Sequence, residues 1–428
     1  MLRSYENTMV FILGLAQGVL FFDRLSLYFL SPLLARDLGL SNAQLGILSA
    51  AMSVTWGSSG FLIGMLSDKL GRQKPILIAG ILLFSLCSTV SGLVESFLAL
   101  IAIRSLMGVF EGPILPISQA VIARVSSPKR VGMNMGMVQN FAMFLIAQFL
   151  GPLVLTHLGV EFGWRAAFYL TGAPGLLIAW LVYKYMRARV STVRPEMERP
   201  HADHQTSEDN AAFQHALPKR NQFLCVLLAC TLGGWMFVLM TFMPLYATRV
   251  NHLSLTQMGV VMSMIGVGGI LSAVAVPGLS DRIGRKPALL GASITSFIVP
   301  ATVLLSRHPP LLLLSAATLA SSFTTGCFPL YISIIPSESM PPHRMTAAIG
   351  MTSAAAEIVG GIVFPPLSGY AADQFGLRAP FLIMAVLAAI GVILILFLVE
   401  TAPVRLRLAT KKASVVTEAE AGDHFVET

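Results

Sequence analysis

The chain has 428 residues, of which 55% are hydrophobic and only 12% are charged, and its mean hydropathy is +0.74. A soluble domain carries about 25% charged residues, so the composition excludes an ordinary soluble enzyme or binding domain. The formal net charge of +8 would suit a protein that binds nucleic acid, but the distribution of the basic residues argues against that class. Apolar residues occur in blocks of about 20, the length that crosses a bilayer core. We therefore predict a polytopic, all-α membrane protein.

Twelve membrane-spanning helices are predicted from the apolar blocks, in two bundles of six. The first bundle occupies residues 1–186 and the second occupies residues 222–400. Residues 187–221 are rich in charged and polar side chains and are predicted to form a solvated cytoplasmic linker, and residues 401–428 are predicted to form a polar cytoplasmic tail. The twelve spans are expected at 8–34, 43–66, 75–94, 97–123, 133–156, 166–186, 222–248, 256–279, 287–306, 309–334, 346–371 and 379–400.

A short, charged turn with glycines occurs twice between apolar spans. Residues 64–75 read GMLSDKLGRQKP, and residues 278–287 read GLSDRIGRKP. One offset of 213 residues that holds over several further matches indicates two copies of a single unit. A parallel repeat of membrane spans is typical of a transporter whose substrate binds between the halves near the bilayer midplane. The further matches pair Ser41, Gln44 and Gly46 with Ser254, Gln257 and Gly259, Pro152 with Pro365, and residues 162–168 with residues 375–381.

The basic residues indicate how the chain is oriented. If the N-terminus is cytoplasmic, 22 of the 29 Lys and Arg residues face the cytoplasm and five face the other side. By the positive-inside rule, both termini are then cytoplasmic, and we expect the protein in the cell (inner) membrane. This bias accounts for the net charge, so the expected partner is the lipid bilayer and no nucleic acid is expected.

No metal site, cofactor or disulfide is predicted. The four cysteines lie in apolar spans, and Cys225 and Cys230 are too far apart around a helix for their side chains to converge. His201, His204 and His215 lie in the polar linker, where a solvated loop is the expected environment. No nucleophile and base occur in a pattern typical of an enzyme.

Five ionisable residues fall well inside the predicted spans: Asp23, Arg24, Arg104, Glu111 and Glu357. Each costs roughly 2.5–3.5 kcal/mol on insertion scales unless it is paired or hydrated, and such residues usually face a cavity and mark a substrate or proton route. Arg–carboxylate pairs that hold helices together are the structural alternative. Arg104 and Glu111 are seven residues apart, two helical turns, and share one helix face.

The repeat indicates that these charges do not serve packing alone. The positions equivalent to the first four carry Met236, Phe237, Ala317 and Thr324. The second copy therefore keeps the fold without the charges, and we expect the chemistry mainly in the first bundle. Glu357 corresponds to Phe144 and is the one charge added in the second bundle.

These residue types suit an organic anion that moves with a proton. Arg24 and Arg104 offer forked donors for a carboxylate or a phosphate, and buried carboxylates can carry protons near neutral pH. We assign proton coupling to Asp23, Glu111 and Glu357. Further substrate contacts are predicted from polar and aromatic residues in the spans, although helix packing is the alternative for each of them: Tyr28, Trp56, Gln119, Gln139 and Asn140.

The repeated turn resembles the signature of the major facilitator superfamily, between helices 2 and 3 and between helices 8 and 9. The resemblance covers essentially the whole chain, and it implies two six-helix bundles, a central site and alternating access. It also implies a cytoplasmic latch, which transfers to Asp68 and Arg72 and more loosely to Asp281 and Arg285.

A narrower resemblance is to the anion:cation symporter family. Residues 22–27 (FDRLSL), 104–113 (RSLMGVFEGP) and 162–168 are similar to motifs of that family. This implies proton-coupled uptake of sugar acids or other carboxylates, with the Arg residues on the substrate and the Asp and Glu residues in proton coupling. The chain departs from the pattern at Gly60 and Leu62, where the family often has Gln and Pro, and Glu357 lies outside it.

Three alternatives stay open beside proton-coupled uptake: a proton-driven exporter of drugs or metabolites, an exchanger of organic phosphates, and a membrane sensor that transports nothing. An exporter would carry a longer Gly-rich signature in the fifth span, and a phosphate exchanger would carry cationic residues in both bundles. The expected partners are a small organic anion and a proton, and we expect a monomer.

Overall fold

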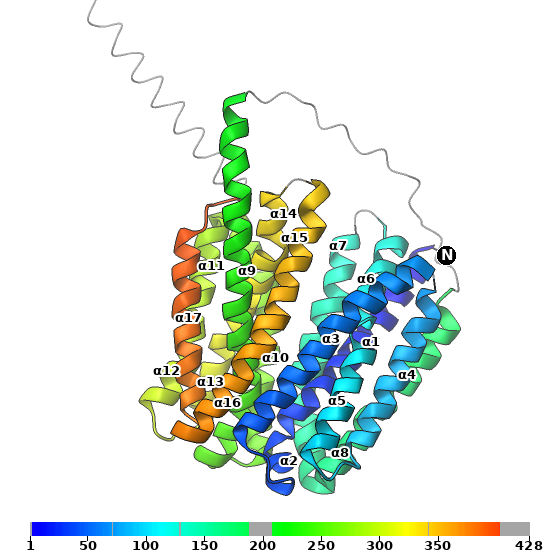
Figure 1. Ribbon diagram of the computed structural model, residues 1–428, viewed down its shortest axis with the longest axis vertical. Helices are drawn as coiled ribbons and strands as arrows, with labels where there is room; N and C mark the ends of the chain where they lie inside the picture. Colours follow the sequence, from blue (N-terminus) through cyan, green and yellow to red (C-terminus); the bar gives the residue numbers. More distant parts are fainter. Residues whose placement is uncertain (1, 71, 128–129, 188–207, 341, 403–428) are drawn as a thin grey trace, which may run out of the picture.

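The computed structural model describes residues 2–70, 72–127, 130–187, 208–340 and 342–402, and every regular element among them is helical. Two groups of helices lie side by side, and they are the two copies of the repeat (Figure 1). The first repeat comprises α1 (Leu2–Phe29), α2 (Ser31–Asp37), α3 (Asn42–Leu70), α4 (Gln73–Ser91), α5 (Phe97–Glu111), α6 (Ile114–Val125), α7 (Val131–Gly136), the π-helical η1 (Met137–Phe141) and η2 (Met143–Leu150), and α8 (Gly151–Tyr185). The second comprises α9 (Glu208–Leu245), η3 (Tyr246–Val250), α10 (Leu255–Ile283), α11 (Arg285–Ile294), η4 (Thr295–Phe297), α12 (Ile298–Leu305), α13 (Leu311–Ser321), η5 (Ser322–Cys327), η6 (Leu330–Ile334), α14 (Ile335–Ser339), α15 (Pro342–Ala355), η7 (Ala356–Val363), α16 (Phe364–Phe375) and α17 (Ala379–Phe397).

The predicted membrane spans are present. The described residues contain 11 helices that are long and apolar enough to cross a membrane, one of which runs over 55 residues from Val131 to Tyr185. Gly163 breaks that run with a φ of 80°, a left-handed conformation that glycine adopts without steric cost. Counted as two helices, the run brings the number of spans to twelve. Gly376, the repeat partner of Gly163, has a φ of 85° at the same place in the second repeat.

Helix α9 begins earlier than the apolar pattern indicates. The predicted linker extends to residue 221, but the helix already starts at Glu208. Glu208 and Asp209 favour a helix N-terminus through the macrodipole, and the alanines that follow are strong helix formers. Hydropathy detects only the membrane-embedded part of such a helix. Residues 188–207 and the tail after residue 402, predicted to be solvated, lie outside the described residues.

Matched capping boxes start the second membrane span of each repeat, which is α3 in the first repeat and α10 in the second. The Ser41 hydroxyl accepts a hydrogen bond from the Gln44 amide at 3.1 Å, and the Gln44 side chain accepts one from the Ser41 amide at 3.0 Å. Ser254 and Gln257 form the same reciprocal pair at 3.2 and 2.9 Å. This arrangement satisfies backbone donors that a helix N-terminus leaves free, which explains why Ser and Gln recur at the repeat offset.

The repeated glycines and prolines hold the two repeats together. A methyl group on Gly46 of α3 would lie 2.3 Å from the carbonyl oxygen of Pro365 in α16. A methyl group on Gly259 of α10 would lie 2.9 Å from the carbonyl oxygen of Pro152 in α8. The offset of 213 residues converts one contact into the other. We call the contact of α3 with α16 and η7 the first seam, and the contact of α10 with α8 and η2 the second seam.

The seams end partway along the helices. Their last close contacts include Ser53 with Gly361 on the first seam and Gly269 with Phe144 on the second. Farther along, toward the repeated charged turns, an added methyl group would meet no described atom within 4 Å at Gly57, Gly132, Gly136, Gly278 and Gly350. The ribbons of the two repeats diverge in the same direction (Figure 1). The repeats therefore meet at a closed end and are apart at the opposite end, which we call the motif end.

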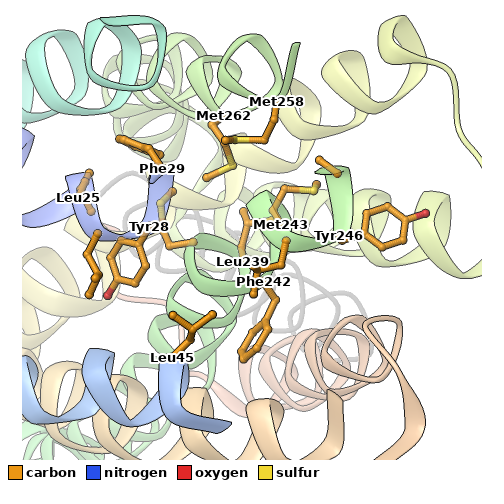
Figure 2. Packing of buried hydrophobic residues seen from close by; sticks show 14 of the residues in the cluster. Leu25, Tyr28, Phe29, Leu45, Leu239, Phe242, Met243, Tyr246, Met258 and Met262 are labelled. Carbon is orange, nitrogen blue, oxygen red and sulfur yellow. The ribbon is translucent and has the colours of Figure 1, made fainter. Parts of the chain in front are cut away.

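Apolar packing reinforces the closed end. One buried cluster takes side chains from both repeats, among them Tyr28 and Phe29 of α1 and Leu239, Phe242 and Met258 of the second repeat (Figure 2). The other two clusters each draw on a single repeat. Close packing of these side chains gains dispersion contacts, so the shared cluster favours contact between the repeats at this end.

Hydrogen bonds also join the two repeats at the closed end. At the closed end, Asp373 of α16 accepts hydrogen bonds from the backbone of Asn42 at 3.0 Å and of Ala43 at 2.9 Å, and from the Asn42 side chain at 2.8 Å. A residue of one repeat thus caps a helix of the other. Asp37 instead has its partners within its own repeat. Hydrogen bonds from Arg165 and Trp164 hold the pKa of Asp37 below its ordinary value.

We predict that Asp373→Ala loosens the closed end. Loss of an N-terminal cap costs about 1 kcal/mol, which corresponds to roughly a fivefold rise in local opening. Hydrogen exchange in peptides that span residues 38–48 should accelerate by about that factor. Asp37→Ala is the matched control, because its bonds stay within one repeat, and it should leave that peptide unchanged. Equal effects of the two variants would show that the cap does not join the repeats.

Candidate functional site

The structure brings together the five charged residues predicted in the spans. Asp23 and Arg24 lie on α1, Arg104 and Glu111 lie on α5, and Glu357 is the second residue of η7. Nη2 of Arg24 is 3.2 Å from Oε2 of Glu357. Electrostatic interactions connect Arg104 with Asp23 and connect Glu111 with both arginines. The first four residues are buried, whereas the Glu357 side chain is 26% exposed.

Arg104 is a buried cation whose donors are largely unused. Its guanidinium lies 4.5 Å from the centre of the Phe168 ring, and its Nη1 is 3.4 Å from the sulfur of Met107. Nε and Nη2 are buried and make no hydrogen bond to the part of the chain that the structure describes. Unpaired buried donors are costly, so this side chain is suited to a carboxylate ligand that uses the planar fork.

Arg24 is held between an aromatic side chain and a carboxylate. Its guanidinium lies 4.7 Å from the centre of the Trp56 ring, a favourable cation–π distance. Close approach of α3 to α5 at Gly108 and Gly112 determines the position of Trp56, because neither glycine has space for a methyl group. Nη1 of Arg24 and Nε1 of Trp56 are buried without a hydrogen-bond partner among the described residues. Both donors are available to a ligand.

The two buried carboxylates of the first repeat have different surroundings. Oδ1 of Asp23 accepts a hydrogen bond from Ser88 at 2.6 Å, and Ser88 in turn lies 2.7 Å from the hydroxyl of Thr171. Asp23 is therefore fixed by α4 and α8. In contrast, both carboxylate oxygens of Glu111 are buried without a hydrogen bond to any described residue. Of the two carboxylates, Glu111 is therefore the one that lies outside the hydrogen-bond network of the described residues.

Tyr28 adjoins the charged residues but belongs to the closed end. Its hydroxyl is 2.8 Å from the hydroxyl of Ser49, and its ring packs in the shared apolar cluster (Figure 2). It interacts electrostatically with Arg24 and Arg104. Tyr28 thus lies between the site and the closed end, with its hydroxyl already hydrogen-bonded.

Gln119, Gln139 and Asn140 are not joined to the charged residues. Nε2 of Gln119 lies 3.5 Å from Oε1 of Gln139 and 3.4 Å from the carbonyl oxygen of Met135, so the two glutamines connect α6 with η1. Asn140 is half-buried on the same π-helical stretch. Among the described residues, no hydrogen bond or ion pair links these three to the five charges. Their predicted substrate contacts remain predictions.

Two buried polar residues of α1 escaped the sequence analysis. Gln17 is fully buried, and neither atom of its amide has a partner among the described residues. It lies seven residues before Arg24, two turns away on the same helix face, and that spacing was the available signal. Glu6 is also buried, and it accepts a hydrogen bond from Asn134 at 2.7 Å. The predicted span began at residue 8 and left Glu6 outside.

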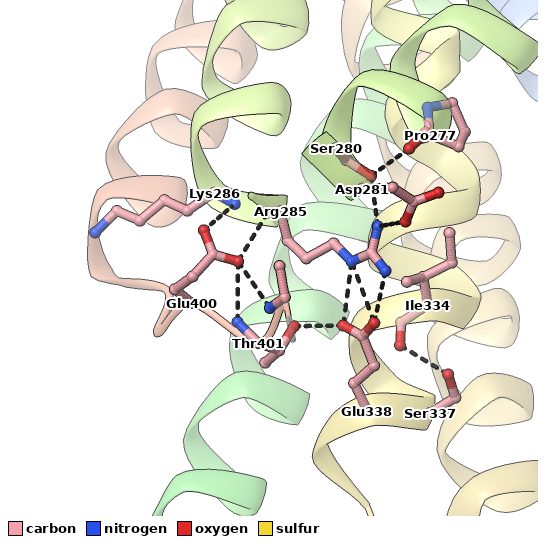
Figure 3. Close-up of polar contacts among 11 residues, drawn as sticks. Pro277, Ser280, Asp281, Arg285, Lys286, Ile334, Ser337, Glu338, Glu400 and Thr401 are labelled. Carbon is pink, nitrogen blue, oxygen red and sulfur yellow. Dashed lines mark hydrogen bonds and ion pairs between the residues drawn. The ribbon is translucent and has the colours of Figure 1, made fainter. Parts of the chain in front are cut away.

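The predicted latch residues lie at the motif end. The side chain of Asp68 lies outside the described residues, and Arg72 is exposed. Arg285 pairs with Asp281, and its Nη2 is 2.7 Å from Glu338, all within the second repeat (Figure 3). Glu400 adds a further contact by accepting a hydrogen bond from the Arg285 amide at 2.7 Å. These contacts order the second turn, and the latch between repeats remains a prediction.

Comparison with known proteins adds independent evidence. The family model described as Major Facilitator Superfamily matches residues 13–359 and 252–424. The chain is 24% identical to the hexuronate transporter of Bacillus subtilis, over 90% of this chain and 93% of that protein. It is 24% identical to a probable sulfoacetate transporter of Cupriavidus necator, over 90% and 92% of the two chains. A probable 4-methylmuconolactone transporter of Cupriavidus pinatubonensis is 27% identical, but the match spans only 65% of that protein.

Solved structures share the fold at low sequence identity. A bacterial homolog of the human lysosomal transporter Spinster, in an inward-facing and occupied conformation, superposes with a TM-score of 0.74 at 16% identity, covering 92% of this chain and 96% of that one. A D-xylose–proton symporter superposes with a TM-score of 0.69 at 18% identity, covering 93% and 99%. These likenesses confirm the predicted all-α fold.

We predict that Arg104→Ala abolishes binding of a carboxylate ligand. Removal of one guanidinium from a buried charge pair costs on the order of 2–5 kcal/mol, at least roughly thirtyfold in affinity. Calorimetry with D-glucuronate and with sulfoacetate would measure the loss, and Arg104→Lys should restore little because an ammonium lacks the planar fork. Arg165→Ala, which removes an exposed arginine at the closed end, is the control. Unchanged affinity in Arg104→Ala would make Arg104 a structural residue.

Proposed function

The chain belongs to the Major Facilitator Superfamily, and we propose on this basis that it imports an organic anion, such as a sugar acid or another carboxylate, together with a proton. The protein is a multi-pass membrane transporter and not an enzyme. The proposal concerns the substrate class, the proton and the direction of transport. One observation carries it: two buried guanidinium groups with unpartnered donors lie beside a buried carboxylate that has no hydrogen-bond partner among the described residues.

The names of the relatives support the substrate class. Hexuronate and sulfoacetate, named for two of them, are both organic anions. A carboxylate on such a ligand would accept hydrogen bonds from the free donors of Arg104 and Arg24, and charge-assisted bonds of this kind are about twice as strong as neutral ones. The indole N–H of Trp56 and the amide of Gln17 could then contact the polar remainder of the ligand.

Proton coupling follows from the shared electrostatics of the site. Burial and the negative charge of Asp23 oppose the ionised form of Glu111, whereas the positive charges of Arg24 and Arg104 favour it. A bound anion offsets those charges, so Glu111 takes up a proton more readily when substrate is present. By thermodynamic linkage, the protonated protein binds the anion more tightly. Proton and anion therefore load together, and Asp23, which accepts a hydrogen bond from Ser88, is not assigned the transported proton.

The membrane orientation is part of the proposal. The excess of basic residues near the motif end supports a cytoplasmic location for that end and for both termini, in a protein of the cell (inner) membrane. The described conformation is then inward-open, with its closed end toward the outside. Two bundles, residues 1–186 and 222–400, would rock about the central site, and Asp68 and Arg72 would contact the other bundle when the motif end closes. We propose a monomer as the functional unit.

We predict that Glu111→Gln separates exchange from concentration. The glutamine imitates the protonated carboxylate, so the variant should bind D-glucuronate and exchange it across the membrane. It should not accumulate D-glucuronate against its gradient, because it carries no exchangeable proton. Proteoliposomes with and without an inward proton gradient measure both modes. Glu95→Gln, which neutralises an exposed carboxylate, should behave like the parent protein.

Two results would contradict the assignment. If gradient-driven accumulation survives in Glu111→Gln, the transported proton would have to be assigned to Asp23 or Glu357. Efflux of the anion driven by an inward proton gradient in the parent protein would favour the alternative, a proton-driven exporter, because proton and substrate would then move in opposite directions.

A further inference from the structure

The ion pair between Arg24 and Glu357 crosses from one repeat to the other. Arg24 is on α1 and Glu357 is on η7, and the pair has one nitrogen–oxygen contact at 3.2 Å. The other ion pairs formed between described residues each stay within a repeat. The pair lies just beyond Ser53 and Gly361, where the first seam has one of its last close contacts. It is therefore placed at the boundary between the seam and the site.

The second seam shows that packing does not require this ion pair. The repeat offset relates Glu357 to Phe144, Arg24 to Phe237, and Trp56 to Gly269. Phe144 packs so closely on Gly269 that an added methyl group would lie 2.2 Å from its ring. The repeats thus meet at the equivalent place through an aromatic ring on a glycine. Because the second seam packs without an ion pair, we infer that the pair of Arg24 and Glu357 at the first seam serves a purpose other than packing.

The pair is also incompletely formed. Only Nη2 of Arg24 contacts Glu357, whereas Nη1 is buried without a partner among the described residues. Strong Arg–carboxylate pairs commonly use two parallel hydrogen bonds. The Arg24 side chain is 4% exposed and the Glu357 side chain is 26% exposed, so the carboxylate is the partner that solvent reaches. Glu357 lies in a π-helical stretch, a feature that occurs often at functional sites.

We propose that Glu357 is a tethered stand-in for the carboxylate of the substrate. It occupies Arg24 while the site is empty, and an incoming carboxylate displaces it and takes both donors of the fork. This inference rests on the proposed function, because it assumes that the substrate is an organic anion. Displacement also breaks the ion pair across the first seam, and substrate binding thereby releases one contact between the repeats.

The displaced carboxylate selects among anions. Glu357 remains on η7 next to the site after it leaves Arg24, so it accepts hydrogen bonds from hydroxyl or ammonium groups of the ligand. It repels a second carboxylate at the same position. A monocarboxylate that carries hydroxyl groups therefore suits this site better than a dicarboxylate of the same length. D-Gluconate and D-glucarate are a matched pair of probes, since both are open-chain six-carbon acids that differ only in whether the terminal carbon is a hydroxymethyl group or a second carboxylate.

Chemical rescue by acetate tests the inference without knowledge of the natural substrate. Glu357→Ala removes the tethered carboxylate and leaves space beside Arg24 for a free one. In full-length protein in detergent, at constant ionic strength, replacement of chloride by acetate should raise the melting temperature of this variant saturably. The parent protein and Glu161→Ala, which loses an exposed glutamate but keeps Glu357, should respond only at higher acetate concentrations, because Glu357 competes for Arg24. The double variant Glu357→Ala with Arg24→Gln should respond no more than the parent protein, because it lacks the guanidinium that the acetate would occupy.

Glu357→Gln keeps the size of the side chain and covers the case in which the alanine variant does not fold. Without competition from the carboxylate, it should bind D-glucuronate about fivefold more tightly than the parent protein. It should also lose the preference for D-gluconate over D-glucarate. Absence of acetate rescue together with unchanged or weaker D-glucuronate binding in Glu357→Gln would overturn the inference.

The two proposals fail in different ways. If acetate stabilises Glu357→Ala through Arg24 but the parent protein accumulates no carboxylate under a proton gradient, the stand-in role holds and the proposed transport function is wrong. If the parent protein accumulates D-glucuronate but Glu357→Gln weakens its binding, Glu357 does not compete with the substrate for Arg24 and the stand-in role is wrong.

Discussion

Close approach of backbone to backbone at two equivalent seams is the constraint on which the rest of the structure depends. Gly46 against Pro365 and Gly259 against Pro152 leave no space for a side-chain methyl group, and in a bilayer such small-residue contacts, not the hydrophobic effect, bring helices together. The seams determine which end is closed and how far along α3 and α10 the repeats stay in contact. The charged residues begin where the seams stop, so the same contacts determine the depth of the site.

The two seams are equivalent in backbone but not in chemistry. Beyond their close contacts, the second seam continues with Phe144 on Gly269, whereas the first continues with Glu357 near Arg24 and Trp56. Aromatic packing does not respond to ligands, but an ion pair with unused donors does. A molecule that must rock between two conformations is served by one constant contact and one exchangeable contact at the same depth. Equivalent positions of the repeat can carry either kind of contact, because the backbone contacts of the seams need only the small residues.

The sequence predicts the repeat, the spans and the buried charges, but it does not predict which residues of different helices contact each other. The offset of 213 residues, the twelve spans and the five intramembrane charges follow from periodicity and from the cost of charge in lipid. Helical spacing gives the face on which a residue lies but not its neighbour on another helix. The partner of Arg24 lies 333 residues away on a helix of the other repeat, and the polar pair of Gln119 and Gln139 stands apart from the charges for the same reason. Gln17 was overlooked because hydropathy averages a single polar residue into its apolar surroundings, and Glu6 was overlooked because it precedes the predicted span.

The proposed roles of Glu111 and Glu357 together address a requirement of symport that substrate binding alone does not meet. A symporter must return empty after it releases its cargo, and an uncompensated Arg24 would resist closure of the repeats around an empty site, because a buried unpaired cation is costly. Glu357 supplies the missing negative charge from within the protein, so the empty site closes with Arg24 paired. In the loaded protein the substrate carboxylate takes that place, and the proton on Glu111 offsets the charge that the substrate brings. The empty and the fully loaded site then carry the same net charge, whereas a site that holds only the proton or only the anion differs from them by one charge. Obligatory coupling would follow from this difference in charge between intermediates, with no further gate at the centre of the molecule.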